Sequence, residues 1–243
     1  MDFTKYTLIQ STYILYALVP PALLFVYKDY ASFLELGPGG TPSTFIGYLR
    51  VTLLRLFALR NPYLPAPIPA ALRPQAGYLT LRHAKNLPKR LGARPKVAGI
   101  APHRQVTQKG TPANYAELSR SIKALANANP SQLKLGTSCF EKHGTGLFSV
   151  SPINYTCNGE ICHAHPSDGS LHLTLHPADA CIVLERCLGE RHPLARGGWF
   201  TRFVPPGFIM VYAPRTMEEL EAVMEIIKAA VWWIAGQSLE DYE

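Results

Sequence analysis

Alternation of apolar and polar residues is most regular between residues 158 and 195, where it predicts a β-hairpin followed by a helix. Residues 170–176 place three leucines on one face and two histidines and a threonine on the other, the pattern of a half-buried strand. Residues 160–165 are predicted to form the preceding strand. The Pro-Ser-Asp-Gly sequence between the two strands has the composition of a turn.

The length of that turn decides which side chains meet. A four-residue loop pairs His165 with Ser170 and His163 with His172, and directly paired residues share one face of a sheet. We therefore expect the three histidines to cluster on one side, whereas a register shift of one residue would separate them. The opposite face is expected to point into a core and carries Cys162, Ala164, Leu171 and Leu173.

Other segments complete a pattern of mixed helices and strands. Apolar residues recur at helical spacing in three segments and form short runs in four others. The predicted helices are 113–128, 179–188 (ended by Gly189) and the segment that begins with the capping box Thr216–Glu219; the predicted strands are 96–100, 133–139, 146–150 and 208–212. We predict an α+β domain over residues 77–243, with an antiparallel sheet and helices packed on one face.

The first part of the chain differs in composition from this domain. Residues 6–27 are apolar and uncharged over about the length that spans a bilayer, and Lys5 and Lys28 flank them. We expect residues 1–28 to form an N-terminal transmembrane anchor, so that the membrane is a partner through residues 6–27. A buried N-terminal helix is the alternative.

Residues 29–76 are expected to connect this anchor to the domain. Within them, residues 44–59 have the spacing of an amphipathic helix, which would lie on a membrane surface or pack against the domain. The predicted apolar side carries Phe45, Leu49, Leu53 and Leu56. Residues 61–75 are rich in proline, which indicates a linker.

Charge is unevenly distributed along the chain, whose formal net charge is +7. Between residues 36 and 116 there is no Asp or Glu, although many Lys and Arg residues fall there. The basic cluster lacks interleaved aromatic residues and a recognised binding module, so we do not expect a nucleic-acid partner. An anionic membrane surface suits it better, and the excess of basic residues favours the domain on the cytoplasmic side. The expected location is the endoplasmic reticulum membrane.

Five cysteines occur, an odd number without a CxxC pair. This composition argues against a disulfide framework and for a reducing compartment. It also argues against a structural zinc site built from thiolates.

Motifs for nucleotide cofactors and for serine nucleophiles are absent from the sequence. The chemistry therefore rests on the histidine cluster. Three interpretations stay open: His163, His165 and His172 could bind a metal ion, one of them could act as a general base near neutral pH, or all three could be structural. A site without a metal is favoured; if a metal is present, these three histidines are its expected ligands.

Two further groups of residues are candidates for the same site. His192 and Arg191 follow the second helix and could close the site from the opposite side, so they join the catalytic candidates. The candidates for substrate binding are His103, Arg104, Thr174, Trp199 and Phe203. We expect His176, before Pro177, to face solvent.

Several short motifs, taken in order, resemble the fungal luciferases. They are Asp29-Tyr30-Ala31-Ser32-Phe33-Leu34-Glu35-Leu36-Gly37-Pro38, the HxH of the hairpin with Leu171-His172-Leu173, Gly189-Glu190-Arg191-His192-Pro193-Leu194-Ala195, and Tyr212-Ala213-Pro214-Arg215. The resemblance extends over nearly the whole chain. The family also includes relatives in fungi that do not glow, so the resemblance leaves light emission open.

The resemblance implies an enzyme that adds molecular oxygen to a hydroxylated α-pyrone such as 3-hydroxyhispidin, without an organic cofactor. In the mechanism that we expect, His163 or His165 removes a proton from an acidic enol or phenol. Arg191 or Arg104 then stabilises the oxyanion. Apolar walls that include Trp199 and Phe203 keep water away. The alternatives are a cyclase or isomerase that uses the same pocket, and a membrane-surface protein that binds a small molecule without turnover.

Overall fold

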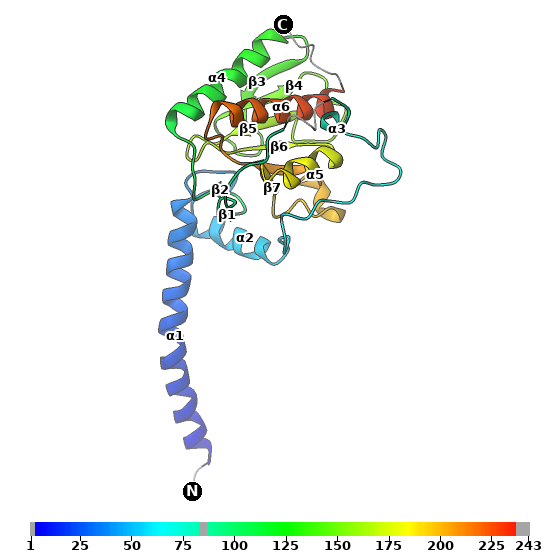
Figure 1. The fold of residues 1–243 in the computed structure, drawn as a ribbon. Helices are drawn as coiled ribbons and strands as arrows, with labels where there is room; N and C mark the ends of the chain where they lie inside the picture. Colours follow the sequence, from blue (N-terminus) through cyan, green and yellow to red (C-terminus); the bar gives the residue numbers. More distant parts are fainter. Residues whose placement is uncertain (1–2, 83–86, 237–243) are drawn as a thin grey trace.

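The computed structural model describes residues 3–82 and 87–236, which form a layered α+β structure (Figure 1). The helices are α1 (Phe3–Glu35), α2 (Phe45–Arg55), α3 (Tyr78–Arg82), α4 (Pro112–Ala128), α5 (Pro177–Glu185), the 3₁₀ helix η1 (Gly198–Arg202) and α6 (Met217–Ala235). The strands are β1 (Val97–Gly99), β2 (His103–Gln105), β3 (Leu133–Thr137), β4 (Thr145–Ser149), β5 (Glu160–Ala164), β6 (Leu171–Thr174), β7 (Gly189–Arg191) and β8 (Phe208–Val211).

Six of these strands form one antiparallel sheet in the order β3-β4-β5-β6-β8-β7, and β1 and β2 form a separate antiparallel pair. Helix α6 packs across β4, β5 and β6, α4 packs on β3, and α5 packs beside β7. The predicted fold class, α+β with an antiparallel sheet and packed helices, is confirmed.

The central hairpin has the register that the turn predicts. His163 pairs with His172, and the His165 backbone N–H donates to the Ser170 carbonyl at 2.8 Å. The opposite face of the two strands is apolar and packs in the core beneath the helices, where Leu171 and Leu173 are fully buried. Burial of each leucine contributes about 1.5–3 kcal/mol, which holds the register because a shift of one residue would move these side chains from the apolar core to the polar face that carries the histidines.

The last helix begins as its capping box predicts. The Thr216 hydroxyl accepts a hydrogen bond from the Glu219 backbone N–H at 3.2 Å. Helix α5, by contrast, ends at Glu185, and the prediction that it reaches residue 188 with Gly189 as its cap is wrong. Gly189 instead opens β7, where a Cβ atom would lie 2.3 Å from the Met210 carbonyl oxygen, so this position requires glycine for close strand approach.

His176 caps the start of α5 and is fully buried, which corrects the expectation that it faces solvent. Its Nδ1 accepts from the Ala178 backbone N–H at 3.1 Å, and its Nε2 donates to the Pro74 carbonyl at 3.0 Å. The imidazole therefore joins the proline-rich segment to α5. Capping explains the position, because the strand ends where the helix begins and both ring nitrogens find backbone partners.

Helix α1 projects from the rest of the chain (Figure 1). Among residues 3–82 and 87–236, no helix is long and apolar enough to cross a membrane, so the predicted transmembrane anchor is not supported. The apolar run is diluted by four tyrosines, four polar residues and two prolines between residues 6 and 27, which lowers its mean hydropathy.

The amphipathic helix α2 packs against the domain through a face that differs from the predicted one. Tyr48 and Val51 are buried in a small cluster with Phe33 from the end of α1. Leu49 and Leu53, expected on the packing side, are exposed. The aromatic contacts of Tyr48 with α1 determine which face of α2 is buried. The spacing of apolar residues along α2 cannot predict these tertiary contacts.

A disulfide joins Cys139 and Cys157, with their Cα atoms 5.9 Å apart. The argument from cysteine number against disulfides is therefore wrong for this pair. Cys162, Cys181 and Cys187 are not in disulfides. An odd number of cysteines means that at least one is not in an intramolecular disulfide, but it does not show which of the others lie close enough to form one.

Asp179, at the start of α5, holds α3 in place. Its carboxylate accepts hydrogen bonds from the backbone N–H groups of Tyr78 and Leu79, each at 2.9 Å, and it is fully buried. Burial raises the pKa of Asp179 to about 6, although these backbone hydrogen bonds oppose the shift. A Cβ atom on Gly77 would lie 2.1 Å from the same carboxylate, so the preceding residue must be small.

We predict that Asp179→Ala lowers the free energy of unfolding by about 2–4 kcal/mol, because two buried N–H groups lose their acceptor at about 1–3 kcal/mol each. Chemical denaturation followed by circular dichroism measures the change. The control is Glu185→Ala, an exposed carboxylate on the same helix, for which a change within about 0.5 kcal/mol is expected. Equal stability of the two variants would contradict the role of Asp179.

Candidate active site

The sheet face that lies opposite the helices carries a row of polar side chains. Strand pairing aligns Glu190 with Met210, Met210 with His172, and His172 with His163. Since paired residues share a face, Glu190, His172 and His163 all point to the same side of the sheet. They are buried there beneath the β1–β2 pair, whose His103 side chain contacts His172.

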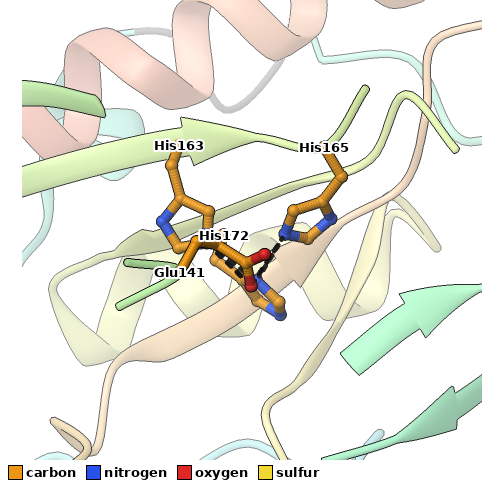
Figure 2. Close-up of side chains that lie close together, drawn as sticks. All are labelled: Glu141, His163, His165 and His172. Carbon is orange, nitrogen blue, oxygen red and sulfur yellow. Dashed lines mark hydrogen bonds and ion pairs between the residues drawn. The ribbon is translucent and has the colours of Figure 1, made fainter. Parts of the chain in front are cut away.

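Three imidazole nitrogens converge in the middle of this row (Figure 2). The Nδ1 atom of His172 lies 3.0 Å from Nε2 of His165 and 3.3 Å from Nε2 of His163. The other ring nitrogen of His172 lies 3.0 Å from Nδ1 of His103. The predicted cluster of His163, His165 and His172 is therefore present, and His103 extends it.

Acidic and hydroxyl groups contact the remote nitrogens of two of these rings. Nδ1 of His163 lies 2.5 Å from Oε1 of Glu160, and Nδ1 of His165 lies 2.9 Å from the Ser170 hydroxyl. That hydroxyl donates to Oδ1 of Asp168 at 2.7 Å. In a neutral ring, Nδ1–H donates to these groups and Nε2 keeps its lone pair, which points toward the cluster.

Glu141 approaches the cluster from the loop after β3. Its Oε1 atom lies 3.9 Å from Nε2 of both His163 and His165. The Arg104 guanidinium bonds both carboxylate oxygens, and its Nη1 is 3.1 Å from Oε1. Burial alone would raise the pKa of Glu141, but the hydrogen bond from Arg104 brings it below its usual value, so the group is a carboxylate at neutral pH.

Burial also determines the protonation of most of the imidazoles. It lowers the pKa of His165 and of His192 to about 4, and that of His103 and His172 well below the usual value, with neighbouring imidazoles adding to the effect at His103 and His172. A lowered pKa leaves these rings neutral throughout the neutral pH range. Neutral rings carry the lone pairs that are needed to accept a proton or bind a metal ion.

A small cavity of about 110 Å³ opens beside the cluster. Glu141, His163 and His172 line its polar end, and His103 and His192 also border it. Apolar residues form the rest of its wall: Ile100, Ala101, Phe140, Leu194, Val204 and Phe208.

A larger groove of about 600 Å³ adjoins this cavity. The two share the lining residues Gly40, Ala101, Phe140 and Leu194. Trp199 and Phe203, two predicted substrate-binding residues, line the groove and are largely exposed. The groove is thus an aromatic surface that leads to the polar cavity.

The remaining predicted residues lie in different places. Arg104 contacts Glu141, which in turn lies beside the histidine cluster, and Arg104 does not line the cavity. Arg191 is directed away from the histidines because it pairs with Ile209 on the helix-covered face, and it donates to the carbonyls of Leu64 and Ala195. Thr174 lines a separate pocket of about 510 Å³ under the proline-rich segment.

His192 closes the cavity as expected, but both of its ring nitrogens are engaged. Nε2 donates to the Ile100 carbonyl at 2.9 Å, and Nδ1 accepts from the Leu194 backbone N–H at 3.2 Å. Its ring stacks edge-on against His103 and His172. We therefore assign His192 to the wall of the cavity rather than to proton transfer.

Sequence reasoning did not identify the acidic residues of the site. Glu160, Asp168 and Glu190 lie within three residues of a clustered histidine in the sequence, a local signal that could have identified them. Glu141 has no such signal, because it reaches His163 and His165 only through the fold. Phe208 stacks on His172 with ring centroids 5.1 Å apart and was predicted only as part of a strand.

Comparison with known proteins agrees with the resemblance in the motifs. The Luciferase domain family matches residues 158–230, which include the hairpin and His192. The chain is 31% identical over 236 residues to a luciferase of Neonothopanus nambi, covering 89% of this chain and 85% of that protein. It is 32% identical over 237 residues to a luciferase of Armillaria ostoyae, covering 90% and 85%. It is 31% identical over 232 residues to a luciferase of Armillaria gallica, covering 88% and 84%. No solved structure matches the chain.

We predict that Asp168→Ala destabilises the site by about 2–4 kcal/mol, because the Asp168 carboxylate accepts from the backbone N–H groups of Gln105 and Ser170, each at 2.8 Å. Loss of these bonds frees both the hairpin turn and the β1–β2 pair. Thermal unfolding measures the effect. Ser167→Ala, an exposed change in the same turn, is the control, and an equally small effect of both changes would contradict the role of Asp168.

Proposed function

The chain belongs to the fungal luciferase family, and on this premise we propose that it is an oxygenase that adds molecular oxygen to a hydroxylated α-pyrone or a related phenolic or polyketide substrate. The proposed substrate resembles 3-hydroxyhispidin, and no organic cofactor takes part. Light emission is part of the proposal only if the product forms in an excited state.

One observation carries the proposal: a cavity with a polar end adjoins an aromatic groove. At about 110 Å³ the cavity accommodates dioxygen and the reacting edge of a ring, whereas the groove of about 600 Å³ has room for the rest of a polycyclic or arylvinyl substrate. Trp199 and Phe203 offer flat surfaces for planar rings. A planar, acidic enol therefore fits both the shape and the chemistry.

The polar end of the cavity supports formation of an enolate. His163 lines the cavity and His165 does not, so His163 is the better candidate to accept the enol proton. Glu160 holds the other ring nitrogen of His163 and fixes the ring orientation. The electron-rich enolate carbon then forms a C–O bond to dioxygen, whose second oxygen becomes the terminal atom of a peroxide.

Apolar walls protect this chemistry from water. Phe140 and Phe208 stack with ring centroids 4.5 Å apart, and both border the cavity. Exclusion of water strengthens every electrostatic interaction with the developing negative charge. The arginines expected to meet this charge do not do so directly, because Arg104 is bound to Glu141 and Arg191 faces the other side of the sheet.

We predict that the purified full chain consumes oxygen when it is supplied with 3-hydroxyhispidin and forms a product enlarged by oxygen. Oxygen electrode traces, product mass and photon counts are recorded together. No conversion of any hydroxylated pyrone, or conversion that continues without oxygen, would overturn the oxygenase proposal. Anaerobic conversion would instead favour a cyclase or isomerase in the same pocket, and binding without any product would favour a binding protein.

We predict different kinetic effects for the groove and the cavity. Trp199→Ala and Phe203→Ala should each raise KM by about tenfold, since each removes an aromatic contact worth about 1.4 kcal/mol. His163→Ala should lower kcat by about 10²–10⁴-fold. Phe45→Ala, an exposed aromatic on α2 outside the groove, is the control and should change neither constant. A fall in kcat alone for the groove variants would contradict their assignment.

A further inference from the structure

We propose that Glu141, His163, His165 and His172 bind one divalent first-row transition metal ion, with three imidazole nitrogens and one carboxylate oxygen as ligands. These donor atoms lie within 4.8 Å of one another. Figure 2 shows the four side chains close together: His163 comes from β5, His165 from the turn that follows it, His172 from β6 and Glu141 from the loop after β3.

The spacing of the nitrogens agrees with a metal centre. Metal–nitrogen bonds of about 2.0–2.1 Å in a tetrahedron place the nitrogens about 3.3 Å apart. The observed separations from Nδ1 of His172 are 3.0 Å to His165 and 3.3 Å to His163. The Glu141 oxygen Oε1 lies 3.9 Å from the Nε2 atoms of both His163 and His165, next to the same centre.

Proton counting gives a second reason. Glu160 and Ser170 occupy the Nδ1 atoms of His163 and His165, so both Nε2 atoms face Nδ1 of His172. His172 can donate one proton to only one of them. Because the site is buried, the lone pair of the other would lack a partner at a cost of about 1–3 kcal/mol, and a cation bound at the centre satisfies all three nitrogens.

The remote nitrogen of each ring has the support that a metal ligand requires. His163 donates to Glu160, His165 donates to Ser170, whose hydroxyl donates to Asp168, and Nε2 of His172 lies 3.0 Å from Nδ1 of His103. His103 in turn has Nε2 3.8 Å from Glu190. Such outer contacts fix the tautomer and orientation of ligating histidines and raise their basicity.

The charge around the centre also favours a divalent cation. The carboxyl groups of Glu141, Glu160 and Asp168 surround the imidazoles, and the Arg104 guanidinium contacts Glu141. Among these residues, acidic side chains therefore lie closer to the centre than basic ones do. Imidazole ligands with a carboxylate suit zinc, iron, nickel and manganese better than magnesium or calcium.

A second group of histidines, His103 with His172 and His192, lies equally close together but is a weaker candidate. Both ring nitrogens of His192 already have backbone partners, and Nδ1 of His103 contacts His172. A metal ion there would displace one backbone hydrogen bond of His192. In the Glu141 group, by contrast, the ligating histidine nitrogens contact one another.

This inference rests on the proposed function for the role of the ion and refines one step of it. Glu141, His163 and His172 line the cavity, so an ion bound by them faces the enol oxygen of the substrate. The ion then supplies the positive charge that neither Arg104 nor Arg191 delivers. With its lone pair on the metal, His163 would be a ligand, and the enol, made more acidic by the nearby cation, would lose its proton to bulk water instead of to His163.

The test measures metal on the full chain without substrate. Protein stripped with a chelator is titrated with Zn²⁺ or Co²⁺, and the stoichiometry is read by elemental analysis and the Co²⁺ absorption spectrum. We expect one ion per chain and, at an excess of one hundred times Kd, a rise in Tm of about 5–10 °C. Binding well below one ion per chain, with no change in Tm, overturns the proposal.

Matched variants locate the site. His165→Gln and His172→Gln should lose stoichiometric binding, while His192→Gln, a buried neighbour that we place outside the ligand set, should keep it. Loss in His192→Gln with retention in His165→Gln would overturn the assignment. If a ligand variant does not fold, the Co²⁺ spectrum of the wild-type chain decides the question by showing or lacking imidazole coordination.

The two proposals fail separately. Stoichiometric metal binding without conversion of any pyrone overturns the proposed function and leaves the metal site standing. Oxygen uptake by metal-free protein in the presence of chelator, combined with no binding in the titration, leaves the function standing and overturns the metal site.

Discussion

The pairing of His163 with His172 across the central hairpin is the constraint on which the site depends. Two interactions fix it from opposite sides of the sheet. Below, Leu171 and Leu173 fill the core beneath α6. Above, Asp168 closes the turn and holds the β1–β2 pair over the histidines through the Gln105 backbone. Apolar burial and a buried carboxylate thus specify the same register.

Burial determines the protonation state of most imidazoles in the cluster as well as their position. Removal from water lowers the pKa of most of these imidazoles, so the rings are neutral and rich in lone pairs. The carboxylates that surround them compensate the loss of hydration with hydrogen bonds. The result is a preorganised polar centre inside apolar walls, which is the environment that charge-developing reactions of small molecules require.

Local patterns in the sequence were sufficient to predict the hairpin, its register, the core face and the cap at Thr216, because each depends on residues close together in the chain. Features that depend on contacts between residues far apart in the chain could not be predicted from these local patterns. Glu141 reaches the histidines from a separate loop, Arg191 turns away because β7 pairs with β8, and Tyr48 reorients α2 through its contacts with α1. The Cys139–Cys157 disulfide likewise depends on proximity that composition does not encode.

The difference in size between the cavity and the groove has a consequence for molecular selection. The small end, about 110 Å³, fits one edge of a molecule and leaves little room for variation there, since packed aromatic rings and buried polar groups form its walls. The wide open end, bordered by exposed Trp199 and Phe203, makes few directional contacts. A site with this shape selects strongly for the part of a ligand that enters the cavity and weakly for the part that lies in the groove. Related chains would therefore accept ligands that differ in the second part after substitution of a few surface aromatic residues, while the buried centre stays the same.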